Sequence, residues 1–389
     1  MGKFVTKFLL IIAWIPVVFL GDLVVGRLYN YFAPEWGKRH LQLTINSYTN
    51  EKEINKSKIN IKPYLLYCNS PNFNLNGVKQ HNNYGYRNSF DINMSKNENE
   101  FRILCIGGST TYGAGVVLPQ EAWPEQLIEL ISENNLKQLS NKKIRVINGG
   151  LEWATSAELL THFSFKHIHL KPDLVIIHSG GNDLAPLWQN NFALDYSHWR
   201  ELSSSASSTL RPYELNLIKF SNTIKFFYSI WFNSFGYTQA NLSLKSKLFE
   251  GLSTNDVLTN ITINSTKAYK TNLSNLVTLI QNNGAEAIFF QFYQPSYIEL
   301  KNKNPAAFLK AEQNLGENFI SYDAGLQKGI ARLRDETLQV CREKKIEFWE
   351  IDANKLPLEY FTDQCHLNKN GQQVKANFIF KNLQKNIIE

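Results

Sequence analysis

Cysteine and methionine are scarce in this chain, which has 4 Cys and 2 Met among 389 residues. The cysteines form no Cys-x-x-Cys pair and have no spacing typical of metal ligands, so a zinc or iron–sulfur module is not indicated. The sequence also has no block of Lys and Arg, and its net charge of +7 is modest for its length. Nucleic acid is therefore not predicted as a partner, and an anionic membrane or cell-wall polymer suits this charge equally well.

Internal repeats are missing, and so is the Gly-x-x-x-x-Gly-Lys-Ser/Thr pattern of a phosphate-binding loop. What remains is an ordinary globular composition, with 43% hydrophobic and 19% charged residues. A chain of this length can bury one large core, or one core plus a smaller appendage.

The N-terminal segment is unlike the rest of the chain. The stretch Phe8–Gly26 is almost entirely apolar and about long enough to cross a bilayer, with Asp22 near its end. We predict that residues 1–27 form an uncleaved membrane anchor that holds the body outside the cytoplasm. The alternative is a cleaved secretory signal, because Val24–Gly26 is a tolerable cleavage site although no Ala-x-Ala is present.

The body divides into a lead-in and an alternating α/β domain. Residues 28–97 are rich in Asn and Lys without clear periodicity and are predicted to be a stalk and irregular lead-in, of which residues 82–87 pack on the main domain. The domain covers residues 98–389. Strands are predicted at residues 102–106, 143–147, 173–178, 286–291 and 346–351, and helices at 121–135, 156–170, 256–282, 322–344 and from 369. This alternation predicts a parallel sheet covered by helices on both faces, a three-layer α/β/α fold.

An insertion at about residues 186–254 interrupts this alternation. It contains a Ser-rich stretch, residues 203–208, and an aromatic cluster, residues 226–235. Insertions of this size are often functional lids or partner surfaces. An ordinary packed helical excursion explains the segment equally well, and the sequence leaves both readings open.

Three short motifs follow predicted strands and carry groups that suit acyl transfer. Gly107-Gly-Ser109 supplies a hydroxyl, Gly180-Gly-Asn182-Asp supplies an amide, and Asp363-x-x-His366 supplies a base with a carboxylate to orient it. Each motif alone is weak. Because ligands bind at the carboxyl ends of parallel strands, we expect the three motifs to meet at one edge of the sheet. Four other histidines of the domain, His162, His167, His169 and His178, are interpreted as structural, and no metal site is predicted.

In motif order and position, residues 98–389 resemble the SGNH branch of the GDSL esterase/lipase family, and residues 102–117 resemble the opening of its membrane-tethered bacterial members. The resemblance implies a flavodoxin-like sheet and catalysis without a cofactor. It implies Ser109 as nucleophile, Asp363 and His366 as its partners, and Asn182 as an oxyanion donor together with the Ser109 N–H.

One position departs from the family pattern. The family has Asn-x-x-x-x-Gly after its second strand, and that glycine gives its backbone N–H to the oxyanion. Counted from Asn148, this chain has Trp153 there. Any residue except proline can donate a backbone N–H, so Trp153 is predicted as the third donor, with Gly149 or Gly150 as alternatives if the loop takes another path.

The predicted function is a serine esterase that removes acyl groups, with acetyl favoured, from envelope or extracellular polysaccharide. The expected partners are an acylated carbohydrate and the membrane; neither cofactor nor metal is needed, and the sequence does not indicate an oligomeric state. The alternatives are an O-acyltransferase to a glycan, a lipid esterase, and a catalytically silent glycan-binding envelope protein.

Overall fold

The computed structural model describes residues 2–35, 37–38, 41, 58–62, 64–133, 142–202, 212–235, 242–244 and 248–387. The chain forms two compact units, a small one from residues 1–54 and 201–243 and a large one from residues 55–200 and 244–389. The Ser-rich stretch 203–208 lies outside the described residues.

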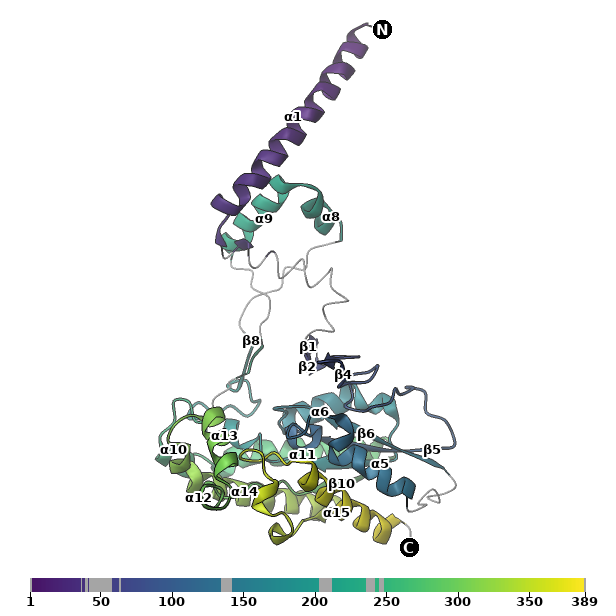
Figure 1. Cartoon of the computed structure of the whole chain (residues 1–389), viewed down its shortest axis with the longest axis vertical. Helices are drawn as coiled ribbons and strands as arrows, with labels where there is room; N and C mark the ends of the chain where they lie inside the picture. Colours follow the sequence, from purple (N-terminus) through teal and green to yellow (C-terminus); the bar gives the residue numbers. More distant parts are fainter. Residues whose placement is uncertain are drawn as a thin grey trace. The chain divides into compact units, whose positions relative to one another are not determined.

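A five-stranded parallel sheet forms the centre of the large unit (Figure 1). Its strands are β5 (Glu100–Gly107), β6 (Lys143–Gly150), β7 (Leu174–His178), β10 (Glu286–Phe290) and β11 (Glu347–Trp349). They lie in the order β6-β5-β7-β10-β11, which is 2-1-3-4-5 when the strands are counted along the chain. This is the flavodoxin-like order, so the predicted fold class is confirmed.

Helices cover the sheet in two layers. The first layer is α5 (Trp123–Glu133) with α15 (Lys369–Ile387), and the second is α6 (Ser156–Phe165), α11 (Ile263–Asn282) and α14 (Asp323–Lys344). The central strands have continuous apolar sequences because helices cover both faces of the sheet. Residues 103–106 and 174–177 are fully buried as a result.

The region between β7 and β11 differs from the prediction in two ways. The expected helix 256–282 is two helices, α10 (Thr254–Thr259) and α11, because Thr262 and Ser265 form a reciprocal cap that starts α11 afresh. Between β10 and α14 the structure has two α-helices that were not predicted, α12 (Tyr297–Lys303) and α13 (Pro305–Leu315). Asn304 caps α13, and a proline is the first residue of this helix. This pair is a helix start signal that the sequence analysis did not use.

The lead-in is more ordered than predicted. It contains two antiparallel pairs, β1 (Ile59–Lys62) with β2 (Leu66–Asn69), and β3 (Asn74–Leu75) with β4 (Val78–Lys79). The segment 82–87 packs on the sheet as expected, since Arg87 N donates to Asn148 O over 3.1 Å and Tyr86 is buried.

The described residues of the small unit are mainly helical. Its long helix α1 (Gly2–Phe32) lies alongside α9 (Asn222–Phe235), which follows α8 (Pro212–Phe220) (Figure 1). Within α1, Ala13–Phe32 is long and apolar enough to span a membrane, a property that secretory signals share. The aromatic cluster of the predicted insertion therefore belongs to a helix that packs on the N-terminal segment. The strands β8 (Arg200–Leu202) and β9 (Leu242–Leu244), which stand before α8 and after α9 in the chain, pair with each other.

Candidate functional site

Ser109, His366 and Asp363 form one chain of hydrogen bonds. Ser109 is the first residue of the short helix α4 (Ser109–Tyr112), directly after β5, and its Oγ lies 2.7 Å from His366 Nε2. On the other side of the ring, His366 Nδ1 donates to Asp363 Oδ2 over 2.7 Å. In the neutral imidazole this bond puts the proton on Nδ1 and leaves Nε2 able to accept the Ser109 proton.

The loop that carries Asp363 and His366 holds its own shape. Thr362 N donates to His366 O over 2.8 Å, and Phe361 bridges to Leu367. The second carboxylate oxygen of Asp363 accepts from the backbone N–H groups of Cys365 (3.0 Å) and His366 (2.9 Å). The carboxylate is therefore fixed by the same turn that presents the imidazole.

Two glycines allow the motifs to approach each other. A Cβ on Gly108 would lie 2.5 Å from Asn182 Nδ2, so the Asn182 amide rests directly against the turn that presents Ser109. A Cβ on Gly115 would lie 2.3 Å from Leu367 O, so the segment after α4 fits closely against the residue that follows His366. Larger residues at either position would separate groups that come from distant parts of the chain.

Asn182 is held by Ala154 and by its neighbour Asp183. Its Nδ2 donates to Ala154 O over 2.9 Å, which leaves a second N–H on the same nitrogen. Asp183 is buried and accepts from the backbone N and the Oγ of Ser156, at 3.0 and 2.6 Å, and from the Tyr196 hydroxyl at 3.1 Å. Burial raises the pKa of the Asp183 carboxyl to about 7 despite these donors. The turn after β7 is thus tied to the first residue of α6.

Trp153 takes a backbone conformation that glycine favours, with φ of 64°. The resemblance described in the sequence analysis implies a glycine at this position. Arg200 holds the loop, because its Nη2 donates to Trp153 O over 2.6 Å while its Nε pairs with the buried Glu158 over 2.7 Å. Glu158 also closes the cap of α6 by accepting from Thr155 N over 2.7 Å.

The electrostatics around His366 favour its protonated form. Burial alone lowers the pKa of this imidazole, but the neighbouring Cys365 and Asp363 side chains outweigh burial and hold the pKa well above its usual value. Burial likewise raises the pKa of Asp363, yet the hydrogen bonds from His366 and from the backbone of Cys365 keep it below the usual range. Cys365 was not singled out from the sequence, although it stands inside the Asp-x-x-His motif.

A pocket of about 70 Å³ opens beside Ser109. Its wall includes Gly108, Trp153, Asn182 and Cys365, and it also includes two residues that follow β10, Gln294 and Tyr297. Both are buried, and the polar atoms at the ends of their side chains, Gln294 Nε2 and Tyr297 Oη, are enclosed with them. These two were missed from the sequence, although their place after a strand puts them at the same carboxyl edge.

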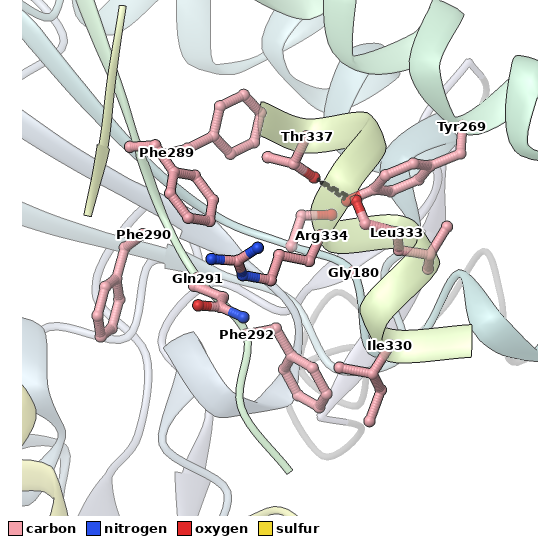
Figure 2. Close-up of a pocket in the computed structure, with 12 residues that line it drawn as sticks. Gly180, Tyr269, Phe289, Phe290, Gln291, Phe292, Ile330, Leu333, Arg334 and Thr337 are labelled. Atoms are coloured by element: carbon pink, nitrogen blue, oxygen red, sulfur yellow. Dashed lines mark hydrogen bonds between the residues drawn. The ribbon is translucent and has the colours of Figure 1, made fainter. Parts of the chain in front are cut away.

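A second pocket lies behind the turn at Gly180, between α11, α14 and β10 (Figure 2). Tyr269 and Thr337 are joined across it by a 3.0 Å hydrogen bond, and the side chains of Phe289 and Phe292 line it. Its volume is about 20 Å³, room for roughly one water molecule. The pocket beside Ser109 is therefore the better candidate for a substrate.

Asp363, Cys365 and His366 also form a group of potential metal ligands, with their ligand atoms within 4.8 Å of one another. Both ring nitrogens of His366 are already bonded, one to Asp363 and one to Ser109. A cation would have to displace at least one of these bonds, so the arrangement suits proton transfer better than metal binding.

No protein-family model and no curated protein matches this chain. Solved structures similar to it include a lipase/acylhydrolase from Enterococcus faecalis, 14% identical with a TM-score of 0.39, covering 73% of this chain and 96% of that one. A GDSL-like lipase from Bacteroides thetaiotaomicron VPI-5482 is also 14% identical, with a TM-score of 0.35 and coverage of 73% and 88%. An acetyl xylan esterase is 11% identical, with a TM-score of 0.40 and coverage of 73% and 100%.

Proposed function

We propose that this protein is a serine esterase in which Ser109 is the nucleophile, His366 the general base and Asp363 the residue that orients the base. The observation that carries the proposal is the pair of 2.7 Å contacts that runs from Ser109 Oγ through the His366 ring to Asp363 Oδ2. A hydroxyl, an imidazole and a carboxylate in this order are the parts that nucleophilic acyl transfer requires.

The reaction has two halves. Ser109 Oγ attacks the ester carbonyl carbon while its proton moves to His366 Nε2, and the tetrahedral intermediate collapses as Nε2 returns that proton to the leaving alcohol. A water molecule, deprotonated by His366, then attacks the acyl group on Ser109. The acid leaves and the Ser109 hydroxyl is restored. Throughout, Asp363 keeps the proton on Nδ1 and stabilises the transient imidazolium.

The negatively charged oxygen of the tetrahedral intermediate needs hydrogen-bond donors, and three N–H groups are proposed for this role. The Ser109 N–H lies at the start of α4, where the first N–H groups have no partner within the helix. Asn182 Nδ2 has one N–H left after its bond to Ala154 O. Trp153 offers its backbone N–H from a glycine-like conformation and lines the same pocket, which supports it as the third donor.

The size of the pocket and its aromatic edge favour a small acyl group on a carbohydrate. The pocket, about 70 Å³ in volume, has room for an acetyl group beside Ser109. Trp153 is 38% exposed and offers a flat apolar surface on which a sugar ring can stack. With α1 as a membrane anchor, the esterase acts outside the cytoplasm on acetylated envelope or extracellular polysaccharide. Membership of the SGNH esterases follows from the same residues and is part of this proposal.

Hydrolysis of p-nitrophenyl acetate by the wild type, Ser109→Ala and Ser179→Ala tests the central claim. Ser179 lines the same pocket and serves as the matched control. We expect Ser109→Ala to lose about 10⁴-fold or more in kcat and to escape labelling by a fluorophosphonate, while Ser179→Ala keeps both properties. Equal rates for wild type and Ser109→Ala contradict the proposal. Product analysis with an acetylated glycan, with and without a second glycan as acceptor, separates hydrolysis from transfer.

A further inference from the structure

Helix α9 turns its polar side toward α1. Asn222 Nδ2 donates to Asp22 Oδ2 over 3.2 Å, and Ser229 Oγ donates to the Tyr29 hydroxyl over 3.0 Å. Between them, Lys225 Nζ lies 4.7 Å from the centre of the Tyr29 ring. Residues three and four apart share one face of a helix, so these three side chains form a single polar stripe along α1.

The apolar side of the hairpin α8–α9 (residues 212–235) faces outward. Successive helix residues are about 100° apart, which puts Phe227 on the side of α9 away from α1 and Ile230, 37% exposed, on the flank of the helix. Phe227 is 64% exposed, and on α8 Leu217 and Phe220 are 49% and 88% exposed. A helix of a water-soluble domain buries its apolar stripe and exposes its polar one. Here the arrangement is reversed, and an apolar surface of this kind marks an interaction site.

The contact between α1 and α9 has features that suit a lipid environment. Asp22 lies within the apolar segment of α1, and its carboxylate accepts from Ser221 Oγ (2.6 Å) and from the backbone N–H groups of Asn222 (2.9 Å) and Thr223 (2.8 Å). An acidic residue at membrane depth needs such partners, and the N-terminus of α9 provides them. A Cβ on Gly26 would lie 2.8 Å from the Asn222 side chain, the close approach that small residues permit between membrane helices.

We propose that the hairpin α8–α9 docks on the lipid bilayer beside α1 and buries Leu217, Phe220, Phe227 and Ile230 among the lipid chains. The bilayer is the occupant because the exposed face belongs to the same helical unit as the apolar surface of α1, on which Val18, Phe19 and Leu20 are 61–67% exposed. This inference rests on membrane anchoring by α1, which is part of the proposed function. It makes the central insertion of the chain a second membrane contact.

Spin labels on the full-length protein in phosphatidylcholine–phosphatidylglycerol vesicles test the proposal. The labels are attached to Phe227→Cys on α9, Val18→Cys on α1 and Lys301→Cys on an exposed site of the large unit, each in a Cys365→Ser background because the other three native cysteines are buried. Oxygen concentrates in lipid, whereas a nickel chelate stays in water. We expect collisions with oxygen to dominate at positions 18 and 227, and collisions with nickel to dominate at position 301.

The outcomes separate the hairpin from the anchor. If position 227 behaves like position 301 while position 18 stays in lipid, the proposal is wrong and anchoring by α1 stands. If position 18 is also in water, both are overturned. If position 227 is shielded from both reagents and its spectrum is broadened by spins on neighbouring chains, a second copy covers this face and the proposal fails. A label at Phe220→Cys gives an independent reading of the same face.

Discussion

At the scale of single residues, Cys365 has more influence on the site than its sequence suggests. It precedes the proposed base, lines the pocket beside Ser109, and its sulfur lies within 4.8 Å of ligand atoms of both Asp363 and His366. Its proximity is one of the contributions that hold the pKa of the imidazole well above the usual value. A base must be neutral to accept the Ser109 proton, so the raised pKa sets the acid limit of activity.

Replacement of Cys365 by alanine is expected to lower the pKa of His366. Since the imidazole then stays neutral at lower pH, the acid limb of the kcat/KM profile moves to lower pH. The maximal kcat/KM on the plateau should stay close to the wild-type value. The measurement is a pH profile of p-nitrophenyl acetate hydrolysis. Cys68→Ala, a buried cysteine outside the pocket, is the control and should leave the midpoint in place. An unchanged midpoint in Cys365→Ala contradicts the assigned cause.

Asn182→Ala tests the proposed oxyanion donor. One lost donor costs about 2.7–4 kcal/mol of transition-state stabilisation, so kcat should fall roughly 10²–10³-fold while KM changes little. The buried Asp183, which ties the turn to Ser156, stays in place in this variant. We therefore expect the thermal unfolding temperature to remain close to the wild-type value. A parallel loss of folding stability and activity would show that Asn182 acts on the structure instead.

The residues that the sequence predicted for the site are those that combine a reactive group with a place after a strand. Ser109, Asn182 and the Asp363–His366 pair meet this test. Gln294 and Tyr297 also follow a strand, but they carry no reactive group. An amide and a phenol belong to no short motif that would distinguish them from core residues. Cys365 acts on the pKa of His366, and Arg200 holds the backbone of Trp153. Such contacts depend on the folded structure, and no short sequence motif predicts them.

At the scale of elements, α9 depends on a side chain from the other end of the chain. Asp22 accepts from Asn222 N and Thr223 N, and this contact completes the helix N-terminus as a capping residue does. The sequence separation is about two hundred residues, so no capping rule based on neighbours detects it. For the same reason the sequence predicts a lid, a partner surface or a packed helical excursion for the insertion, and it does not predict the pairing with the N-terminal helix.

Asp22→Ala should therefore loosen α9 more than any other element. Loss of a cap costs about 0.5–2 kcal/mol, so the amides of residues 222–235 should exchange with solvent deuterium several-fold to tens of fold faster. Hydrogen exchange read by mass spectrometry of the full-length protein in vesicles provides the measurement. Peptides from α14 in the large unit serve as the internal reference. Equal protection of α9 in variant and wild type would show that the Asp22 contacts do not stabilise it.

At the scale of the whole molecule, a buried basic pair joins the last helix to the sheet. Lys375 Nζ on α15 donates to His178 Nε2 over 3.2 Å, and His178 Nδ1 donates to Phe290 O over 3.0 Å. Burial lowers the pKa of Lys375 to about 8. It also keeps the pKa of His178 well below the usual value, so the imidazole accepts from Lys375 in its neutral form. A helix and two central strands are thus joined through one polar contact.

Lys375 makes folding stability depend on pH in the alkaline range. Below about pH 8 the native state carries a charge in a buried place, and this penalty is fully present. Between about pH 8 and 10.5 the native state has released the proton while the unfolded chain still holds it, so stability rises with pH there, by up to about 3 kcal/mol. Lys375→Met lacks this titration. The unfolding temperature of the wild type minus that of Lys375→Met should increase from pH 8 to pH 10, and a constant difference contradicts the assignment.

The overall architecture followed from the sequence because apolar strand runs and helical spacing recur from residue 100 onward, and helix-covered parallel sheets have few arrangements. The helices α12 and α13 escaped prediction because they lie between two strong signals, β10 and α14, within a stretch rich in polar residues. The division into two units did not follow from composition. It depends on contacts between segments that are distant in the chain.

The path of the chain between the two units bears on how the proposed esterase can be released from the membrane. The backbone passes from one unit to the other three times, after residues 54, 200 and 243. An enzyme on a single tether is released by one proteolytic cut. Under the proposed membrane docking, a cut near residue 54 leaves the large unit joined to the hairpin, which stays with the membrane. We expect limited proteolysis of vesicle-bound protein to nick the chain without freeing activity into the wash until all three crossings are cut.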